Sequence, residues 1–161
     1  MNSFKYDLAM PAALQALRFS MSLSGQNSID LVPSYLLLGK ASIGLKKYNQ
    51  AEEYLTLAKW AILKVSDCHP GMRGLLHRNI GLLNFSRGNY EDALQHLSLD
   101  VYYHSIAYNP EHISVSGGYY QLGNVFFKQT KMELVTAFYD KVVSIWKMTL
   151  IRPHEKFGER L

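Results

Sequence analysis

The feature that most constrains the fold is a pattern of residue types that recurs every 42 residues, centred on Gly39, Gly81 and Gly123. An aromatic ring stands four positions before each glycine and a large apolar residue directly before it. A small apolar residue follows twelve positions later, and a large one sixteen positions later. The members are Tyr35, Leu38, Gly39, Ala51 and Leu55, then His77, Ile80, Gly81, Ala93 and Leu97, then Tyr119, Leu122, Gly123, Val135 and Tyr139. Chance does not align five columns through three cycles, so we expect a chain of repeated units.

The recurring glycines lie among apolar residues with helical spacing. A glycine inside a helix costs about 1 kcal/mol relative to alanine. Its recurrence at Gly39 in "YLLLGKASIG" and again in the next two units therefore indicates a close neighbour that leaves no room for a side chain. We expect that neighbour to be the second helix of the same unit.

Capping signals and polar turns divide each unit into two helices. "NPEHIS" places Asn109 before Pro110 and predicts a helix start there, and Asp67 and Asp30 stand at comparable positions. The turns "LKKYNQ", "SRGNYE" and "KQTKME" are short, as antiparallel neighbours require. The predicted helices are 31–46, 49–65, 69–86, 91–108, 110–128 and 132–149.

The segment before the first full unit predicts a single helix over 4–23. "KYDLAMPAALQALRF" matches the second helix of a unit whose first helix is absent, with Pro11 inside it as a source of a kink. Leu14, Leu17 and Phe19 are expected to form an exposed apolar face that promotes self-association. The piece is expected to belong to a longer array, and Pro153 is expected to end the helical pattern.

These signals predict an all-α, right-handed α-solenoid of helix pairs. The predicted division is one domain over 1–150, with a half repeat at 4–23 and repeats at about 31–65, 69–108 and 110–149. Residues 151–161 are expected to form a C-terminal tail.

Composition limits the classes of function. The 161 residues are 48% hydrophobic, and 17 Lys and Arg against 13 Asp and Glu give a net charge of +4. The basic residues are scattered, which argues against a nucleic-acid partner. Cys68 is the single cysteine, so neither an internal disulfide nor a cysteine-built zinc site is expected, and a reducing compartment suits the chain. No apolar run approaches the ~20 residues of a membrane span.

Catalysis and metal binding find no supporting motif. A nucleophile, a base and a group that orients the base are not found at a catalytic spacing. Cys68 and His69 lack further ligands at the spacing that zinc needs, and His77 falls in the aromatic packing column. We expect no catalytic residue, no metal and no cofactor; bound metal in the purified chain would revive the enzyme or metal-protein alternative.

The order of aromatic residue, Leu-Gly, Ala and a later apolar residue resembles the tetratricopeptide repeat, a pair of antiparallel helices A and B. The resemblance implies that the glycines mark the crossing of A and B, and that partners bind the concave face formed by the A helices. The concave-face candidates are Leu36, Lys40, Arg78, Asn79, Phe85, Tyr120, Asn124, Phe127 and Lys128. Lys40, Arg78 and Lys128 also fit an alternative in which they are ordinary solvated surface.

Some relatives of this repeat class grip a chaperone's acidic C-terminus with lysines and asparagines. Asn79 stands in a column where such a clamp has an asparagine, but Leu36 and Gln121 occupy columns that should be basic. The clamp is therefore not expected here.

A narrower resemblance is carried by "LVPSYLLLGKASIGL", "LLHRNIGLL", "NYEDALQHL" and "SGGYYQLGNVFF". These runs together are similar to the central region of the zinc finger MYND domain-containing proteins with tetratricopeptide repeats, without their finger. The resemblance implies a scaffold in the cytoplasm and cytoskeleton, in the axoneme of cilia or flagella, with other axonemal or repeat proteins as partners. The alternative is a cytosolic adaptor that binds a short peptide or C-terminus in its groove.

Overall fold

The computed structural model describes residues 3–25 and 28–158, and every regular element in these ranges is a helix. The all-α prediction is confirmed. The elements are α1 (Ser3–Ser24), the short 3-10 helix η1 (Ile29–Leu31), α2 (Val32–Gly44), α3 (Tyr48–Leu63), α4 (Pro70–Arg87), α5 (Tyr90–Ala107), α6 (Ile113–Lys128) and α7 (Met132–Gly158).

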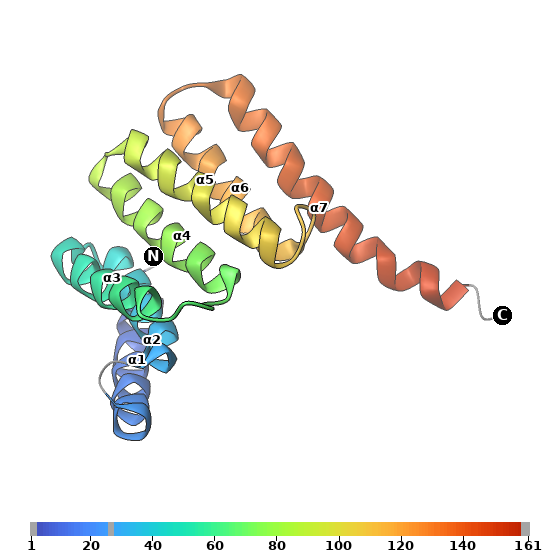
Figure 1. Ribbon diagram of the computed structural model, residues 1–161. Helices are drawn as coiled ribbons and strands as arrows, with labels where there is room; N and C mark the ends of the chain where they lie inside the picture. Colours follow the sequence, from blue (N-terminus) through green and yellow to red (C-terminus); the bar gives the residue numbers. More distant parts are fainter. Residues whose placement is uncertain (1–2, 26–27, 159–161) are drawn as a thin grey trace.

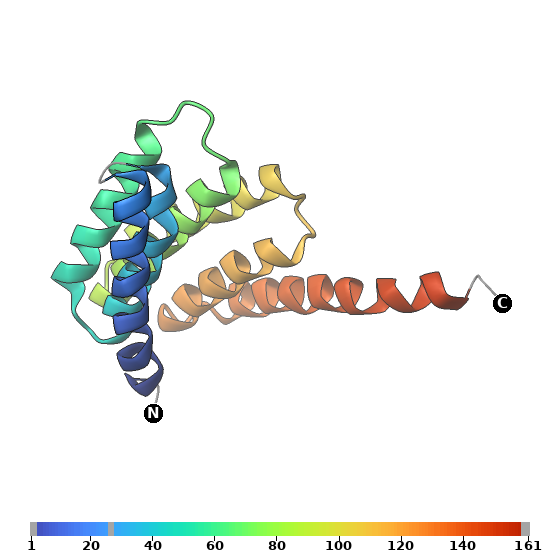
Figure 2. The same cartoon turned by 90° about the horizontal axis from the view of Figure 1, so that it is seen from below.

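Consecutive helices pack as antiparallel pairs, α2 with α3, α4 with α5 and α6 with α7 (Figure 1). The first helix of each pair also contacts the first helix of the next, since α4 touches both α2 and α6. Helix α1 packs on α2 at one end of the array. Figure 2 shows that α7 projects beyond its partner α6 at the other end. The result is a helix-pair array with an A layer of α2, α4 and α6.

The three recurring glycines lie where the two helices of each pair come closest. A Cβ atom on Gly39 would stand 2.8 Å from Cδ2 of Leu55, one on Gly81 would stand 2.7 Å from Cγ of Leu97, and one on Gly123 would stand 2.5 Å from Cε1 of Tyr139. Each contacted side chain follows its glycine by sixteen residues and belongs to the second helix of the same pair. The glycine column is thus where each pair is held in close contact.

The turns inside the pairs share one hydrogen-bonded geometry. Lys46, Gly88 and Thr130 are 42 residues apart and all have positive φ, at 60°, 85° and 59°. The amide after each one donates to a carbonyl five residues earlier: Lys47 to Ser42, Asn89 to Asn84 and Lys131 to Phe126. This is the Schellman motif, in which one left-handed residue ends a helix. The positions of these turns are predictable from their polar residues, whereas the shared left-handed residue is not, because only Gly88 among the three is a glycine.

The core is divided along the array. One cluster joins α1, η1, α2, α3 and α4 and includes the fully buried Leu31, Val32 and Leu38. A second joins α5 and α6 through Leu97 and Val125, with Phe85 of α4 and Phe138 of α7 against it. Burial between neighbouring helices holds the array together, as in solenoids in general.

Two predicted helix starts differ from the structure. Asn109 does not cap α6, because its side chain accepts from the amide of Glu111 in a loop turn and the helix begins at Ile113. The cap is the imidazole of His112, whose Nδ1 accepts from the Ser114 amide at 3.2 Å. Asp67 likewise does not cap α4. The cap is His69, whose Nδ1 accepts from the Gly71 amide at 3.1 Å.

The predicted start of α2 also needs correction. Ser28, rather than Asp30, supplies the side-chain cap, and its Oγ accepts from the Asp30 amide at the start of η1. Pro33 lies in the first turn of α2, as the sequence indicated. A 3-10 turn therefore precedes the helix that the sequence predicted to begin at 31.

The ends of the array also differ from prediction. Helix α7 runs through Pro153 to Gly158 rather than ending near 149. The fixed φ of proline fits a helix, so the helix continues although Pro153 donates no backbone hydrogen bond. Leu17 is buried against the first core cluster rather than exposed, because α1 packs that side on its neighbours. Leu14 and Phe19 are exposed. Residues 159–161 of the predicted tail lie outside the described residues.

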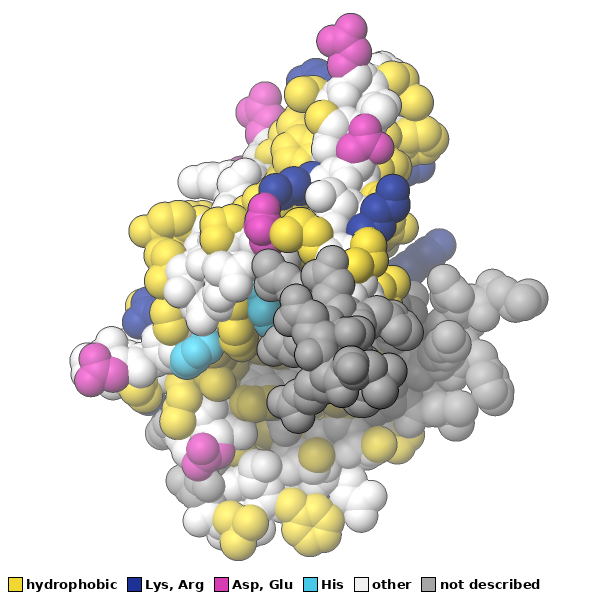
Figure 3. Space-filling view, turned by 90° about the vertical axis from the view of Figure 1, so that its right-hand side faces the viewer, with side chains coloured by type: hydrophobic (Ala, Val, Ile, Leu, Met, Phe, Trp, Pro, Cys, Tyr) yellow, Lys and Arg dark blue, Asp and Glu magenta, His cyan; other side chains and the backbone are white. Residues whose placement is uncertain are grey.

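Hydrophobic side chains remain on the surface at both ends of the array. Figure 3 shows one such face, with hydrophobic side chains spread between single charged ones. Phe19 is 63% exposed on α1, and Trp146 and Leu150 are exposed on α7. Within the described residues, no helix has an apolar run long enough to cross a bilayer.

Candidate functional site

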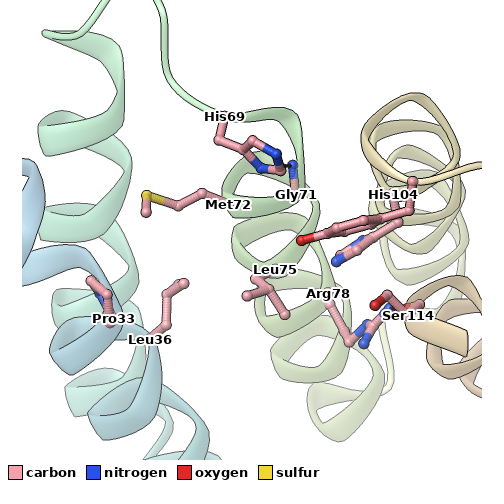
Figure 4. Close-up of a pocket in the computed structure, with 10 residues that line it drawn as sticks. Pro33, Leu36, His69, Gly71, Met72, Leu75, Arg78, His104 and Ser114 are labelled. Carbon is pink, nitrogen blue, oxygen red and sulfur yellow. Dashed lines mark hydrogen bonds between the residues drawn. The ribbon is translucent and has the colours of Figure 1, made fainter.

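The A layer contains a hollow of about 420 Å³ between α2 and α4, which we call the α2–α4 hollow. Pro33 and Leu36 of α2 lie opposite Met72 and Leu75 of α4 (Figure 4). The ends of α5 and α6 close it on the far side. Its lining residues are Pro33, Leu36, His69, Gly71, Met72, Leu75, Arg78, His104, Tyr108 and Ser114.

The wall that α2 and α4 form is apolar. Leu36 is largely buried, whereas Leu75 is 42% exposed and faces the opening. Met72 packs partly against the first core cluster and partly lines the hollow. A methionine and a leucine at such a rim can accommodate apolar side chains of varied shape, because the thioether chain of methionine is flexible.

The opposite wall contains an ion-pair cluster that joins three helices. Nε of Arg78 on α4 donates to Oδ2 of Asp100 on α5 at 2.7 Å. Nη2 of the same arginine donates to the Ser114 carbonyl on α6 at 2.8 Å. Nδ1 of His104 lies 2.6 Å from the other carboxylate oxygen, Oδ1 of Asp100. The cluster therefore ties the second pair of helices to the third.

The burial of the Asp100 carboxylate makes this cluster costly to break. Asp100 has no exposed surface, and Arg78 keeps only a fifth of its side chain exposed. An unpaired buried charge costs several kcal/mol, so removing one partner of such a pair costs about 3–5 kcal/mol. Arg78 thus holds the wall of the hollow in place rather than offering a free charge.

Three further glycines make room for the cluster. A Cβ atom on Gly117 would stand 2.7 Å from Nη1 of Arg78, and one on Gly118 would stand 2.7 Å from Oδ2 of Asp100. A Cβ atom on Gly74 would meet the His104 ring directly. The two glycines of "SVSGGYY", in the first turns of α6, therefore leave the space that the ion pair fills.

Aromatic rings close the end of the hollow where the loops lie. Tyr108 stacks on His112 with ring centres 4.7 Å apart, on His104 at 6.1 Å and more obliquely on His69 at 5.8 Å. His69 and His112 each cap a helix of the A layer through an unprotonated Nδ1. The same rings thus fix two helix starts and one end of the hollow.

Two of the nine predicted concave-face residues, Leu36 and Arg78, line the hollow. Asn79 differs from the expectation: it is buried, and its Nδ2 donates to the Leu75 carbonyl at 2.9 Å, so its amide bonds to its own helix. Phe85 is half-buried and packs against Tyr90 and the second core cluster. Lys40 is exposed on α2 outside the hollow.

The four candidates on α6 lie together, away from the α2–α4 hollow. Tyr120 stacks on Tyr139 with ring centres 5.8 Å apart. Asn124 accepts from the Tyr139 hydroxyl at 2.8 Å and donates to Gln121, so its amide is engaged within the fold. Phe127 and Lys128 are exposed at the end of the helix.

Sequence reasoning missed most of the hollow. Met72 and Leu75 were not among the candidates, although they stand six and three residues, respectively, before Arg78 on the same helix. His104 lies on α5, the second helix of a pair, and Tyr108 directly follows that helix, whereas the concave-face candidates all lie on A helices. The spacing of His69 and His112, 43 residues apart and each directly before a helix, was a usable signal.

The residues that the structure describes hold no group of three or more His, Cys, Asp or Glu side chains arranged to hold a metal ion. Cys68 is buried, and burial raises the pKa of its thiol despite the nearby Arg73. The geometry of the α2–α4 hollow is that of an apolar recess with an internally paired polar wall.

Comparison with protein families bears on α2 and most of α3. Helix pairs in close contact at a glycine, turns of one shared geometry and a layer of A helices are features of helix-pair repeats. Tetratricopeptide repeats imply protein partners in general terms. Residues 32–59 match the tetratricopeptide repeat.

Proposed function

We propose that this chain is a non-catalytic scaffold that binds a segment of a partner protein in the α2–α4 hollow. The observation that supports the proposal most is the hollow itself, an apolar recess of about 420 Å³ in the A layer. Its size falls within the range of recesses that bind small ligands or side chains of a partner. The repeat at residues 32–59 supports a partner that is a protein.

The chemistry of the walls favours an apolar anchor on the partner. Leu75 and Met72 offer apolar surface at the rim, while the charge of Arg78 is paired with Asp100. A partner carboxylate would have to compete with the Asp100 carboxylate for this arginine. An apolar side chain that enters beside Leu36 and Leu75 gains burial without that competition.

A pair of matched leucine variants tests this proposal. Leu75→Asp places a charge in the hollow, and Leu57→Asp makes the same change on α3, where the leucine is 46% exposed against 42% for Leu75. We expect both variants to fold, because both side chains already contact water. Affinity capture from ciliated cells, with quantification of the bound proteins, should show partners that Leu75→Asp loses and Leu57→Asp keeps. Equal capture by both variants would contradict the proposal.

The proposed cellular setting is the axoneme of cilia or flagella, with axonemal or repeat proteins as partners. The support is the resemblance of runs such as "NYEDALQHL" to the repeat region of the MYND-type zinc finger proteins. A tagged chain expressed in ciliated cells should remain on the axoneme after detergent extraction. Complete release with the detergent-soluble fraction would favour the cytosolic adaptor instead.

A further inference from the structure

A second recess, the α3–α5 hollow, lies on the other side of α4, with a volume of about 100 Å³. Leu76, His77 and Ile80 of α4 line it, whereas Leu75 and Arg78 line the α2–α4 hollow. Successive residues of a helix are rotated by about 100°, which places these two sets on opposite sides of α4. The two hollows are therefore separate surfaces.

The floor of the α3–α5 hollow is apolar and its rim is basic. Ile62 and Leu76 are buried beneath it, and Lys59 of α3 and Arg73 of α4 line it. Neither cation takes part in an ion pair within the described residues, and no carboxylate lines the recess. Of the nearby acids, Asp100 is paired with Arg78 and Glu52 is paired with Arg87.

Two histidines on neighbouring helices complete the recess. Nδ1 of His77 lies 2.9 Å from Nδ1 of His96, so one ring donates and the other accepts. The two imidazole rings are close to parallel with centres 5.1 Å apart, and the ring of Tyr103 is nearly parallel to that of His77 at 5.5 Å. The stack fixes two imidazoles at the rim, close to the two cations.

Burial and the nearby positive charges act in the same direction on the pKa of His77. Burial first, then the charges of His96, Lys59 and Arg73, lower the pKa of His77 to about 4, against an opposing effect of Asp100. Burial also lowers the pKa of His96, and Lys59 adds to this while Asp92 opposes it. Both imidazoles are therefore neutral near neutral pH, and the charge at the rim comes from Lys59 and Arg73.

We propose that the α3–α5 hollow binds a partner segment that presents one apolar side chain flanked by carboxylates. The volume corresponds to about three water molecules, enough for one aliphatic side chain and too little for a helix. The apolar floor receives the side chain, and Lys59 and Arg73 meet the flanking carboxylates. This site lies beyond the one proposed above and does not depend on the α2–α4 hollow.

Peptide titration followed by NMR tests the proposal directly. The probe is a terminally blocked pentapeptide, Asp-Glu-Leu-Glu-Asp, added to the isotope-labelled full chain at low salt. Saturable shifts are expected at Leu76, His77 and Ile80. Two comparison peptides separate the contributions: Asn-Gln-Leu-Gln-Asn lacks the charges, and Asp-Glu-Ser-Glu-Asp lacks the apolar anchor. Both should bind about five- to tenfold more weakly.

Matched variants of the protein provide the control. Lys59→Gln with Arg73→Gln removes the two rim charges, and Lys40→Gln with Lys47→Gln removes two exposed charges elsewhere. The first double variant should weaken peptide binding about five- to tenfold, and the second should leave it within about twofold. Neither pair carries an ion pair among the described residues, so both variants should keep their helical spectra.

The pH dependence gives an independent readout. A bound carboxylate near His77 and His96 favours their protonation, so the peptide should bind more tightly at about pH 5.5 than at about pH 7.5. The imidazole resonances should report a higher pKa for His77 in the complex. Equal effects from the two double variants, or shifts confined to Met72 and Leu75 of the other hollow, would overturn the proposal. An absence of saturable shifts would also overturn it.

Discussion

Arg78 illustrates how a residue's role depends on partners that are distant in the sequence. From the sequence, Arg78 is a candidate for the concave binding face of an A helix. In the structure it reaches Asp100, 22 residues away, and the carbonyl of Ser114, 36 residues away. Arg78 is therefore neither a free binding charge nor ordinary solvated surface, and charge reversal at this position should change stability before it changes recognition.

The first prediction concerns this arginine. Arg78→Ala should lower the free energy of unfolding by about 3–5 kcal/mol, because it leaves the Asp100 carboxylate buried without its main partner. Lys128→Ala, an exposed change on α6, should alter it by less than about 0.5 kcal/mol. Urea denaturation of both variants measures the difference. Similar stability of the two would mean that the cluster contributes little.

The second prediction concerns His77 and pH. The folded protein holds the pKa of His77 at about 4, below the 6.5 of an exposed histidine, so the unfolded chain binds the extra proton first as pH falls. The free energy of unfolding should therefore be unaffected above pH 6.5 and should decrease between pH 6.5 and about 4. Because the ring is only partly buried, we expect a loss of about 1–2 kcal/mol.

His77→Gln isolates this effect, since it keeps a polar side chain and removes the titration. The variant should lose less stability than the native chain over the same pH range, as measured by urea denaturation at each pH. Parallel curves for the two proteins would assign the pH dependence to other groups.

At the scale of the elements, the turns within the pairs repeat as regularly as the glycines do. Lys46, Gly88 and Thr130 occupy the same left-handed position, but only Gly88 is a glycine. A residue with a Cβ pays about 1–2 kcal/mol for this conformation, and a β-branched residue is especially unsuited to it. The third turn is therefore strained relative to the second.

The third prediction follows from this strain. Thr130→Gly should raise the free energy of unfolding by about 0.5–1 kcal/mol, after allowance for the greater freedom of glycine in the unfolded chain. Gly88→Ala should lower it by about 1 kcal/mol for conformational reasons alone, because no atom lies within 4 Å of a Cβ there. Thermal and urea denaturation measure both. A lower free energy of unfolding for Thr130→Gly, or a higher one for Gly88→Ala, would contradict the strain assigned to these turns.

The elements themselves were largely predictable from sequence, and their starts were not. Gly39, Gly81 and Gly123 mark the pair crossings because a close approach of two helices excludes a side chain, a local constraint visible in one helix. His69 and His112 act as caps through an imidazole nitrogen, outside the usual set of serine, threonine, aspartate and asparagine. Such a cap depends on ring stacking with Tyr108, which comes from another helix.

The binding surface was harder to predict for the same reason. Leu36 was identified because the A helices form one layer. Met72, Leu75 and Tyr108 become a surface only when α2, α4 and the end of α5 are placed together. The periodicity of a single helix cannot report how wide a gap its neighbour leaves. Helix positions therefore followed from the sequence, whereas the hollow did not.

At the scale of the whole molecule, the two ends of the array share an exposed apolar character. Leu14, Phe19 and Leu23 are exposed on α1, with Leu23 at 86%. On α7, Val143, Trp146 and Leu150 are exposed at a spacing that places them on one side of the helix. Exposed apolar residues grouped in this way promote association.

The fourth prediction is that the isolated chain self-associates through these ends. Sedimentation equilibrium should show a concentration-dependent increase in mass for the native chain. Trp146→Glu with Leu150→Glu should reduce this association, and Leu14→Lys with Phe19→Lys should do so at the other end. A monomer at all concentrations, or indifference to both pairs of changes, would refute the prediction.

Site-specific photocrosslinking can show whether a partner protein occupies the α2–α4 hollow. A benzoylphenylalanine placed at position 75 lies at the rim of the hollow, and one placed at position 57 lies on α3 as a control. We expect position 75 to crosslink to a single partner segment that contains an apolar residue, and position 57 not to crosslink to it. A complex that forms without crosslinks from position 75, or with equal crosslinks from both positions, would contradict it.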